Sequence, residues 1–371
     1  MPELQQILQQ YGNQYKEKNN IPIYVSKTLN AIEKCRTAEL GAHIDVCNEC
    51  GYEQISYNSC RNRHCPKCQA SAKEKWIYNQ KFDLLNVQYF HVVFTIPDIL
   101  NKVVYYNQTK MYNVLFKATA ETLQELAKDK KYLGATIGFT TILHTWGQNL
   151  KDHPHIHAIV PAGGLDKLGN WRNSKKKFFI PVKVLSKVFR GKFIYYMKQE
   201  KLDYIKEIEN LKIVEEFDKF ISSLYTKDWI VYCKEPFKNV NNVIEYLGRY
   251  THRVAISNNR ILNIDNGNIA FKWRDYRDKN KMKTMILDAD EFIRRFILHI
   301  LPPRFMKIRH FGLLGNRNKT KKLTLCKSLT NTKVLTKENI SPLEILKKKS
   351  GKDFNLCPIC HKGHLIRPSP A

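Results

Sequence analysis

The first half of the chain contains short, strongly apolar runs that alternate with longer segments of mixed polarity. Residues 87–97 (VQYFHVVFTIP) predict a buried strand that ends at a proline. Residues 134–147 (GATIGFTTILHTWG) and 154–164 (PHIHAIVPAGG) predict two further strands, joined by a connection of hairpin length. Apolar residues at helical spacing predict helix within 100–129.

Helical spacing continues in the second half of the chain, in a lysine-rich stretch over 181–225 and again over 239–252. Three short strands are predicted next, at 253–257 (RVAIS), 260–265 (RILNID) and 268–273 (NIAFKW). An Asp-Asn-Gly-Asn sequence between the last two is a strong hairpin turn. The pattern therefore predicts an α+β fold with a largely antiparallel sheet for this middle part of the chain.

The distribution of cysteines and charge predicts three segments. Residues 1–85 hold the first cysteine cluster and are expected to bind zinc and DNA. Residues 86–303 hold the α+β pattern, and residues 304–371 form a basic segment that ends in a short cysteine motif.

Charge narrows the choice of partner. Lysine and arginine number 62 against 34 acidic residues, a formal net charge of +28. Such an excess favours a polyanionic partner, and charge alone leaves DNA and RNA both open. The basic residues do not gather on one amphipathic helix, no apolar run is long enough to span a bilayer, and no leader opens the chain. We therefore expect a cytoplasmic nucleic-acid-binding protein without a membrane partner, associated with the nucleoid while it is on DNA.

Two Cys-x-x-Cys pairs, CNEC (47–50) and CPKC (65–68), stand fourteen residues apart. Two such turns can close a tetrahedral Zn²⁺ site, and four protein ligands would make that site structural. The predicted ligands are Cys47, Cys50, Cys65 and Cys68, with Cys60 and His64 in reserve and Cys35 and His43 close enough in sequence to replace a ligand or bind a second ion. Between the pairs, Arg61 and Arg63 are expected to contact DNA phosphates.

A third pair, CPIC (357–360), is half of a zinc site. Cys326 is the nearest cysteine that could join Cys357 and Cys360 in a second site. A frayed basic tail without metal is the alternative interpretation.

Two histidines lie two residues apart within the strand predicted at 154–164. His155 and His157 would therefore face the same side of the sheet, while their apolar neighbours pack the other side. Paired imidazoles near a core are suited to bind a metal. A third ligand is expected from His144 across the hairpin, with His153 as the alternative.

Two tyrosines, Tyr246 and Tyr250, lie at i and i+4 of the helix predicted at 239–252 and would share one face. Aromatic packing on the sheet is the plainer interpretation, but Arg249 and Arg253 add phosphate-binding groups. A tyrosine can attack a phosphodiester and keep the DNA 5′ end as an ester, and a metal on the histidines would polarise that phosphate. The pattern thus predicts a metal-dependent DNA nuclease.

Several long motifs resemble the rolling-circle insertion-sequence transposases of the HUH class, in which U is a hydrophobic residue. These are HPHIHAIVPAGGL, YLGRYTHRVAISNNRI, FKWRDYR and IRHFGLLGNR. The segments CRTAELGAH, CNECGYEQISYNSCRNRHCPKCQ and YFHVVFTIP are similar to the zinc-binding N-terminal domain and first strand of that family. The similarity covers residues 34–317 in the same order.

The resemblance implies an antiparallel HUH nuclease domain of the replication-initiator type. It places the histidine motif on His155 and His157 and the tyrosine motif on Tyr246 and Tyr250. It also implies Mg²⁺ or Mn²⁺, single-stranded DNA at transposon ends and a 5′-phosphotyrosine intermediate. A plasmid or phage replication initiator and a non-catalytic, zinc-dependent DNA-binding protein are the alternatives.

Overall fold

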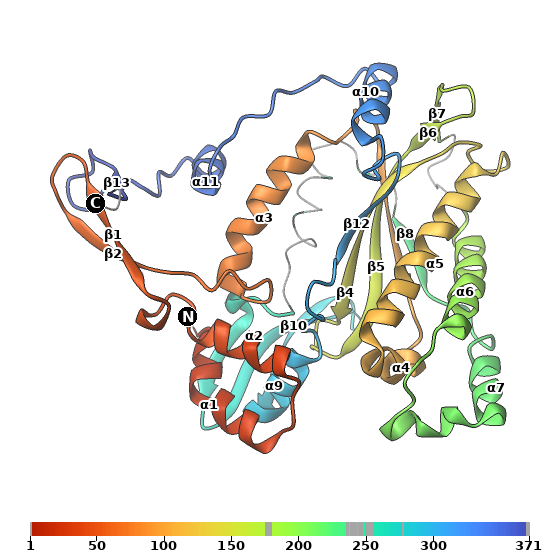
Figure 1. Cartoon of the computed structure of the whole chain (residues 1–371), viewed down its shortest axis with the longest axis horizontal. Coiled ribbons are helices and arrows are strands. Elements are labelled where there is room, and N and C mark those ends of the chain that lie inside the picture. The colour runs from red at the N-terminus through yellow and green to blue at the C-terminus, as the bar shows by residue number, and fades with distance from the viewer. Residues whose placement is uncertain are drawn as a thin grey trace.

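The computed structural model describes residues 2–174, 180–234, 237, 243, 248, 255–276 and 278–368. It has the predicted α+β fold class, with antiparallel pairing in every sheet (Figure 1). None of the helices in these ranges combines the length and the apolar character that a bilayer crossing requires.

A five-stranded sheet forms the centre of the molecule, in the order β12-β4-β5-β3-β8. Its strands are β3 (Tyr89–Thr95), β4 (Gly138–Trp146), β5 (Asp152–Pro161), β8 (Val231–Lys234) and β12 (Ile308–Gly312). The three strands predicted in the first half of the chain are β3, β4 and β5, and β4 and β5 form the predicted hairpin. Because β5 is central, every residue from Pro154 to Pro161 is buried.

Helices cover one face of this sheet and form the main apolar core. Phe90, Val92 and Phe94 of β3 alternate with residues of the opposite face and pack in this core. The covering helices are α4 (Asn101–Tyr106), α5 (Gln108–Lys128), α6 (Val182–Gln199) and α7 (Val214–Ser223). The helix predicted within 100–129 is thus confirmed as α4 and α5.

The helical stretch predicted over 181–225 is interrupted. Between α6 and α7 the chain is extended and then forms the short helix η3 (Lys206–Lys212). The side chain of Asn107 hydrogen-bonds both the amide and the carbonyl of Asp203, at 2.7 and 3.0 Å. This tertiary contact satisfies backbone groups that a continuous helix would have used.

The opposite face of the sheet is packed by α3 (Pro66–Lys81) and by Val243. Val243 is fully buried in a small cluster with Ile142 of β4 and Ile159 of β5. Trp76 of α3 packs against the same cluster. This face also carries the histidines described below.

A second core joins the N-terminus to a distant part of the chain. The helices α1 (Leu4–Lys18) and α2 (Ile23–Glu33) pack with α9 (Ala289–Ile297) and with a three-stranded sheet. That sheet consists of β9 (Ile261–Asp265), β10 (Asn268–Asp275) and β11 (Lys281–Asp288). Asn266 and Gly267 both have positive φ, 45° and 76°, which is the backbone of the predicted hairpin turn.

The strand predicted at 253–257 is wrong for its described part. Ala255 and Ile256 form a bend, and η4 (Asn258–Arg260) follows. Both side chains are buried in the second core. Their apolar character therefore reflects tertiary burial rather than pairing in a sheet.

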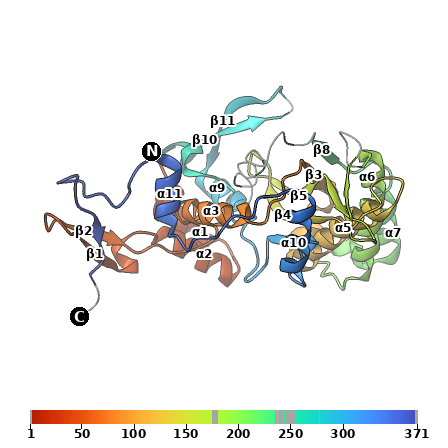
Figure 2. The same ribbon diagram turned by 90° about the horizontal axis from the view of Figure 1, so that it is seen from above.

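The β1–β2 hairpin of the N-terminal segment and the C-terminal strand form a small sheet at one end of the elongated molecule (Figures 1 and 2). The strands are β1 (Ala42–Cys47), β2 (Glu53–Tyr57) and β13 (Leu365–Ile366), with β1 in the centre. The chain reaches this sheet from the far side through α10 (Lys319–Leu329) and α11 (Pro342–Ser350), and Figure 1 shows it passing α3.

Residues 304–371, expected as one basic segment, are therefore divided. Their first strand, β12, pairs with β4 in the central sheet, and their last strand pairs with β1. A short hairpin, β6 (Gly163–Leu165) with β7 (Trp171–Asn173), and the helices η1 (Ala38–Leu40) and η2 (Asp98–Leu100) complete the described elements.

Candidate metal centres

Three histidines share one face of the β4–β5 hairpin. His144 lies directly opposite His155 in the register, and His157 follows two residues later on the same face. Their ring centroids are 4.5–5.4 Å apart, and one nitrogen from each ring lies within 4.8 Å of the others. Their exposed fractions are 3%, 8% and 6%. The structure thus brings the histidine pair together with the third histidine that the hairpin favours.

Neighbouring groups orient two of these rings. His91 Nε2 lies 2.8 Å from Nδ1 of His157, and the two rings stack with their centroids 5.0 Å apart. Burial, with the charges of Lys234 and His155, lowers the pKa of His91 to about 3, so His91 is neutral at pH 7. Nδ1 of His155 donates to the carbonyl of His153. In both rings Nδ1 is engaged, so Nε2 is the nitrogen suited to a metal.

This donor set fits a divalent metal ion. Three imidazoles supply three ligands and leave coordination positions for water or substrate. An imidazole that binds a metal through one ring nitrogen usually donates a hydrogen bond from the other, here Nδ1, to a neighbouring acceptor. His153, the alternative third ligand, lies outside the group, although its ring centroid is 4.9 Å from that of His155.

The predicted nucleophiles Tyr246 and Tyr250, and the predicted phosphate ligands Arg249 and Arg253, lie outside the described residues. The described residues nearest to the two tyrosines in sequence are Gly248, two positions from each, and Val243, three positions before Tyr246. Val243 packs on the sheet face that carries the histidines. A Cβ at Gly248 would lie 2.3 Å from Ile77 Cδ1, so this backbone runs directly against α3.

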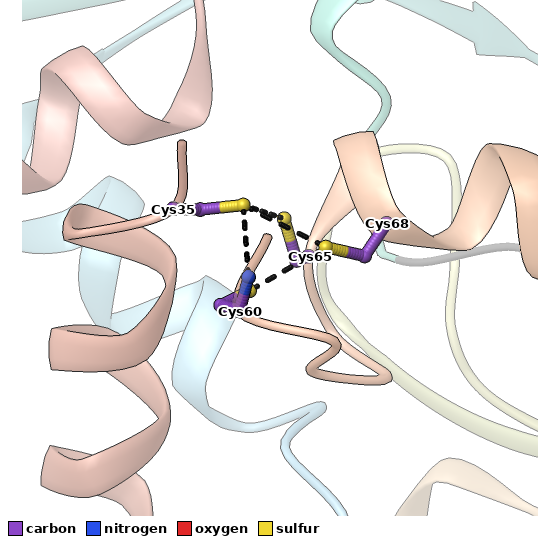
Figure 3. A group of neighbouring side chains, drawn as sticks. All are labelled: Cys35, Cys60, Cys65 and Cys68. Atoms are coloured by element: carbon purple, nitrogen blue, oxygen red, sulfur yellow. Dashed lines mark hydrogen bonds between the residues drawn. The ribbon is translucent and has the colours of Figure 1, made fainter. Parts of the chain in front are cut away.

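The first cysteine group consists of Cys35, Cys60, Cys65 and Cys68. Their sulfur atoms point toward one another from the end of α2, a connecting loop and the start of α3 (Figure 3). The Sγ–Sγ distances are 3.6 Å for two pairs and 3.7 Å for a third. Four thiolates about 2.3 Å from one tetrahedral Zn²⁺ would be separated by about 3.8 Å. The group therefore has the dimensions of a zinc site.

Local structure favours a thiolate at Cys68 in this group. Cys65 is the N-cap of α3 and Cys68 lies in its first turn, where the helix dipole stabilises negative charge. Hydrogen bonds from Cys60 and Cys65 lower the pKa of the Cys68 thiol to about 2.

The second cysteine group consists of Cys47, Cys50, Cys357 and Cys360. Cys47 Sγ lies 3.7 Å from Cys360 Sγ, and Cys50 Sγ lies 3.7 Å from Cys357 Sγ. Hydrogen bonds from the amides of Gly363 and Lys362 lower the pKa of Cys360 to about 6.

The structure corrects the predicted grouping of the cysteines. Cys47 and Cys50 do not share a site with Cys65 and Cys68, because β1 and β2 carry the first pair away from α3 and toward the C-terminus. Cys60, a predicted reserve, lies in the first group. The completed groups are Cys35, Cys60, Cys65 and Cys68 on one side and Cys47, Cys50, Cys357 and Cys360 on the other.

Cys326 does not join the C-terminal pair. It is buried on α10 in an apolar cluster with Leu85 and Leu323, and burial raises its pKa to about 11. The number and spacing of the cysteines were sufficient to indicate the observed groups. Eight cysteines in three Cys-x-x-Cys pairs and two single residues divide into two sets of four, once the single residues Cys35 and Cys60 join one pair.

The segment between Cys60 and Cys65 makes hydrogen bonds to a distant part of the same chain. Arg63 donates to the carbonyls of Phe305, Pro302 and Leu301, so its guanidinium is engaged inside the chain, contrary to the predicted phosphate contact. His64, the other reserve ligand, accepts the Leu301 amide at 3.3 Å and lies outside both groups. Arg61 is exposed.

These contacts tie the first cysteine group to the histidine group. Residues 301–305 connect α9 to β12, and β12 pairs with β4, which carries His144. The sheet edge beside the histidines is thus anchored to the N-terminal segment.

Comparison with known proteins agrees with this arrangement. Residues 7–96 match the family described as the transposase zinc-binding domain, and residues 138–322 match the family described as putative transposase. The chain is 42% identical over 375 residues to the putative transposase y4qJ of Sinorhizobium fredii, covering 98% of this chain and 94% of that protein. It is 28% identical to the transposase for insertion sequence element IS801 of Pseudomonas savastanoi pv. phaseolicola, covering 78% of this chain and 70% of that protein.

Among solved structures, the conjugative relaxase TrwC in complex with mutant OriT DNA is 12% identical, with a TM-score of 0.25, covering 42% of this chain and 70% of that one. The sequence relatives and the family matches confirm the resemblance seen in the motifs. The chain belongs to the IS91-family (Y2) transposases and has their N-terminal zinc-binding domain.

Proposed function

We propose that this transposase nicks and rejoins single-stranded DNA at the ends of its insertion sequence, through a 5′-phosphotyrosine intermediate. The observation that carries the proposal is the buried group of three histidines on the sheet face against which Val243 packs. Tyr246 follows Val243 by three residues, and Tyr250 follows Gly248 by two. A short stretch of chain thus connects the tyrosines to Val243, which packs on the sheet face that carries the histidines.

His144, His155 and His157 would hold Mg²⁺ or Mn²⁺. When bound there, the ion would polarise the scissile phosphate and stabilise the charge that develops on it. Imidazole ligands suit Mn²⁺ better than Mg²⁺, which prefers oxygen ligands. We therefore expect stronger activity with Mn²⁺ at equal concentration.

Tyr246 or Tyr250 would supply the nucleophile. Its oxygen attacks the phosphorus, the bond from phosphorus to the 3′ oxygen breaks, and the 5′ side remains as a tyrosine ester. The tyrosine loses one proton and the departing 3′ oxygen gains one. Attack by a 3′ hydroxyl on this ester reverses the step and joins two strands without an external energy source. A second tyrosine allows a second cleavage while the first ester persists.

The group of Cys35, Cys60, Cys65 and Cys68 would bind a structural Zn²⁺, since four protein ligands leave no open position. Its contribution to the reaction would be indirect. The loop that it closes presents Arg63 and His64 to residues 301–305, which lead into β12 beside the histidine hairpin.

DNA binding is supported by the net charge of +28. Arg61, which is exposed, and Arg249 and Arg253 are the arginines proposed to contact phosphates. A replication initiator with the same chemistry is the rival proposal, and the family to which the chain belongs favours transposition.

The test is a covalent-adduct assay with the full chain, Mn²⁺ and labelled single-stranded DNA from the ends of its own element. We expect label to migrate with the protein on a denaturing gel. Tyr246→Phe or Tyr250→Phe should reduce the adduct, and the double variant should abolish it. Tyr232→Phe is the matched control, because Tyr232 is an exposed tyrosine on β8.

An adduct that survives in the double tyrosine variant would overturn the assigned nucleophiles. No adduct with zinc-loaded wild-type protein would favour a non-catalytic DNA-binding protein. Adduct formation on a plasmid replication origin, but not on the element ends, would favour the replication initiator.

A further inference from the structure

A metal site where the C-terminal segment meets the β1–β2 hairpin is not needed for the proposed chemistry. We propose that Cys47, Cys50, Cys357 and Cys360 bind a second Zn²⁺, which clasps the C-terminal segment to the β1–β2 hairpin. The first pair of ligands and the last are separated by about 310 positions, since Cys50 and Cys357 are 307 apart. This inference does not rest on the proposed function.

The geometry of the four sulfur atoms is that of a bound metal rather than of disulfides. Two Sγ–Sγ distances across the site are 3.7 Å, close to the roughly 3.8 Å of a tetrahedral zinc tetrathiolate and far above the roughly 2.05 Å of a disulfide. All four ligand atoms lie within 4.8 Å of one another. Each pair therefore meets the other with the spacing that one ion requires.

The two Cys-x-x-Cys turns have the same backbone geometry. The amide two residues after the first cysteine donates to its sulfur in both turns, from Glu49 to Cys47 at 3.5 Å and from Ile359 to Cys357 at 3.4 Å. The Gly363 amide donates to Cys360 at 3.3 Å. Such amide donors favour the charged thiolate, which is the form that binds zinc.

The turns are built to fit against each other. A Cβ at Gly363 would lie 2.5 Å from Cys47 Sγ and 2.8 Å from Glu49 Cβ, so only glycine allows this approach. The side-chain oxygen of Asn48 accepts a hydrogen bond from the backbone amide of His364 at 2.7 Å. The backbone amide of Asn48 donates to the carbonyl of His364 at 3.2 Å. Pairing of β13 with β1 extends the contact.

The clasp ends a strap that lies along α3. Lys349 of α11 pairs with the buried carboxylate of Glu74 at 2.9 Å, and Tyr78 donates to the Glu338 carbonyl at 3.3 Å. Figure 1 shows this segment passing α3 before it reaches β1. Without the ion, the two-residue β13 and a few polar contacts would have to hold the C-terminal end. The proposed ion is therefore the main fastening of this segment to the zinc-binding domain.

Metal counting on the full chain tests the proposal. The parent protein carries His155→Ala, so that the histidine group does not contribute zinc. Elemental analysis should find two zinc ions in the parent and one in Cys360→Ser. Cys65→Ser should also fall to one, from the other group. Cys326→Ser should keep two, because Cys326 lies outside both groups.

Two results would overturn the clasp: one zinc in the parent, or two zinc ions retained by Cys360→Ser. X-ray absorption on the parent keeps the test decisive if the variant fails to fold. The expected spectrum has four sulfur ligands at about 2.3 Å for both ions. Iron in place of zinc, or nitrogen or oxygen ligands at half of the zinc, would contradict the assigned tetrathiolate.

Hydrogen exchange distinguishes a clasp from two independent turns. Cys360→Ser should increase exchange of peptides within 42–57, although the substitution lies about 300 residues away. Cys50→Ser should do the same for peptides within 356–366. Gly363→Ala, which keeps all four ligands, should increase exchange in both regions. Unchanged exchange in the partner region in all three variants would contradict a shared site.

Discussion

The cysteine groups and the histidine group show two ways to assemble metal ligands. The histidines come from one hairpin, are nine-tenths buried on a five-stranded sheet, and number three. The cysteines come from element ends, loops and turns in segments up to 313 positions apart, and each group numbers four. A group of four saturates a tetrahedral ion, whereas a group of three leaves a position for substrate.

The number of ligands distinguishes sites that stabilise the fold from a site that could take part in a reaction. At a site with four protein ligands, the free energy of metal binding stabilises the fold, because the ion holds together segments that would otherwise separate. An unsaturated site needs a rigid support, because its ligands must hold their geometry when substrate enters. The sheet supplies that support for the histidines, and Arg63 and His64 connect the first cysteine group to the segment that leads into it.

The largest expected effect is on catalysis. His155→Ala should lower the rate of adduct formation at least about 100-fold, because it removes one ligand of the ion that would stabilise the phosphate. The zinc content of the cysteine groups should stay the same. His153→Ala is the matched control and should retain activity, since His155 contacts the backbone carbonyl of His153. Equal losses of adduct formation in His155→Ala and His153→Ala would contradict the assignment of His155, and not His153, as a metal ligand.

Cys65→Ser should have the opposite profile. We expect the loss of one zinc ion and a fall in the free energy of unfolding on the order of several kcal/mol, because metal binding at such a site is coupled to folding. Elemental analysis and urea unfolding measure the two effects. Cys233→Ser, at a buried cysteine outside both groups, should keep its zinc. Full zinc content in Cys65→Ser would contradict the first cysteine group.

His91 sharpens the comparison, since it supports a ligand without being one. His91→Phe removes the partner of His157 Nδ1 and should weaken Mn²⁺ binding about 10–100-fold. A Mn²⁺ titration of adduct formation measures the shift in the concentration required. His91→Gln, whose amide oxygen can accept the same proton, should recover part of the affinity. An unchanged Mn²⁺ requirement in His91→Phe would show that the contact does not orient the ligand.

The smallest effect concerns pH. Burial lowers the pKa of His299 to about 4. In the folded chain its ring forms hydrogen bonds with the carbonyl of Leu150 and the hydroxyl of Thr145. The unfolded chain takes up this proton near pH 6.5, so stability falls as the pH drops below 6.5 toward 4. From pH 7.5 to pH 5 the loss should be about 2 kcal/mol.

Urea unfolding at both pH values, for wild type and His299→Gln, isolates this contribution. The variant should be less stable at pH 7.5 but should lose about 2 kcal/mol less between the two pH values. Protonation of the cysteines affects both proteins alike and therefore cancels. Parallel losses would mean that His299 titrates normally in the folded state.

Local patterns predicted most of the fold. The strands β3, β4 and β5, the hairpin between the last two and the turn at Asn266 and Gly267 follow from alternation and turn residues a few positions apart. Patterns failed where a distant contact overruled them. Asn107 holds Asp203 out of the helix expected over 181–225, and burial in the second core explains the apolar residues at 255–256.

The sequence by itself determined that His155 and His157 share one face, because strand periodicity decides it, and the register of the hairpin then placed His144 rather than His153 with them. It also determined that the cysteines form turns suited to zinc. Only the tertiary structure decided which turns share an ion. Every Cys-x-x-Cys turn has the same local chemistry, so the choice of partner depends on where β1 and α3 carry each turn, and on the strap that returns the C-terminus to the N-terminal sheet.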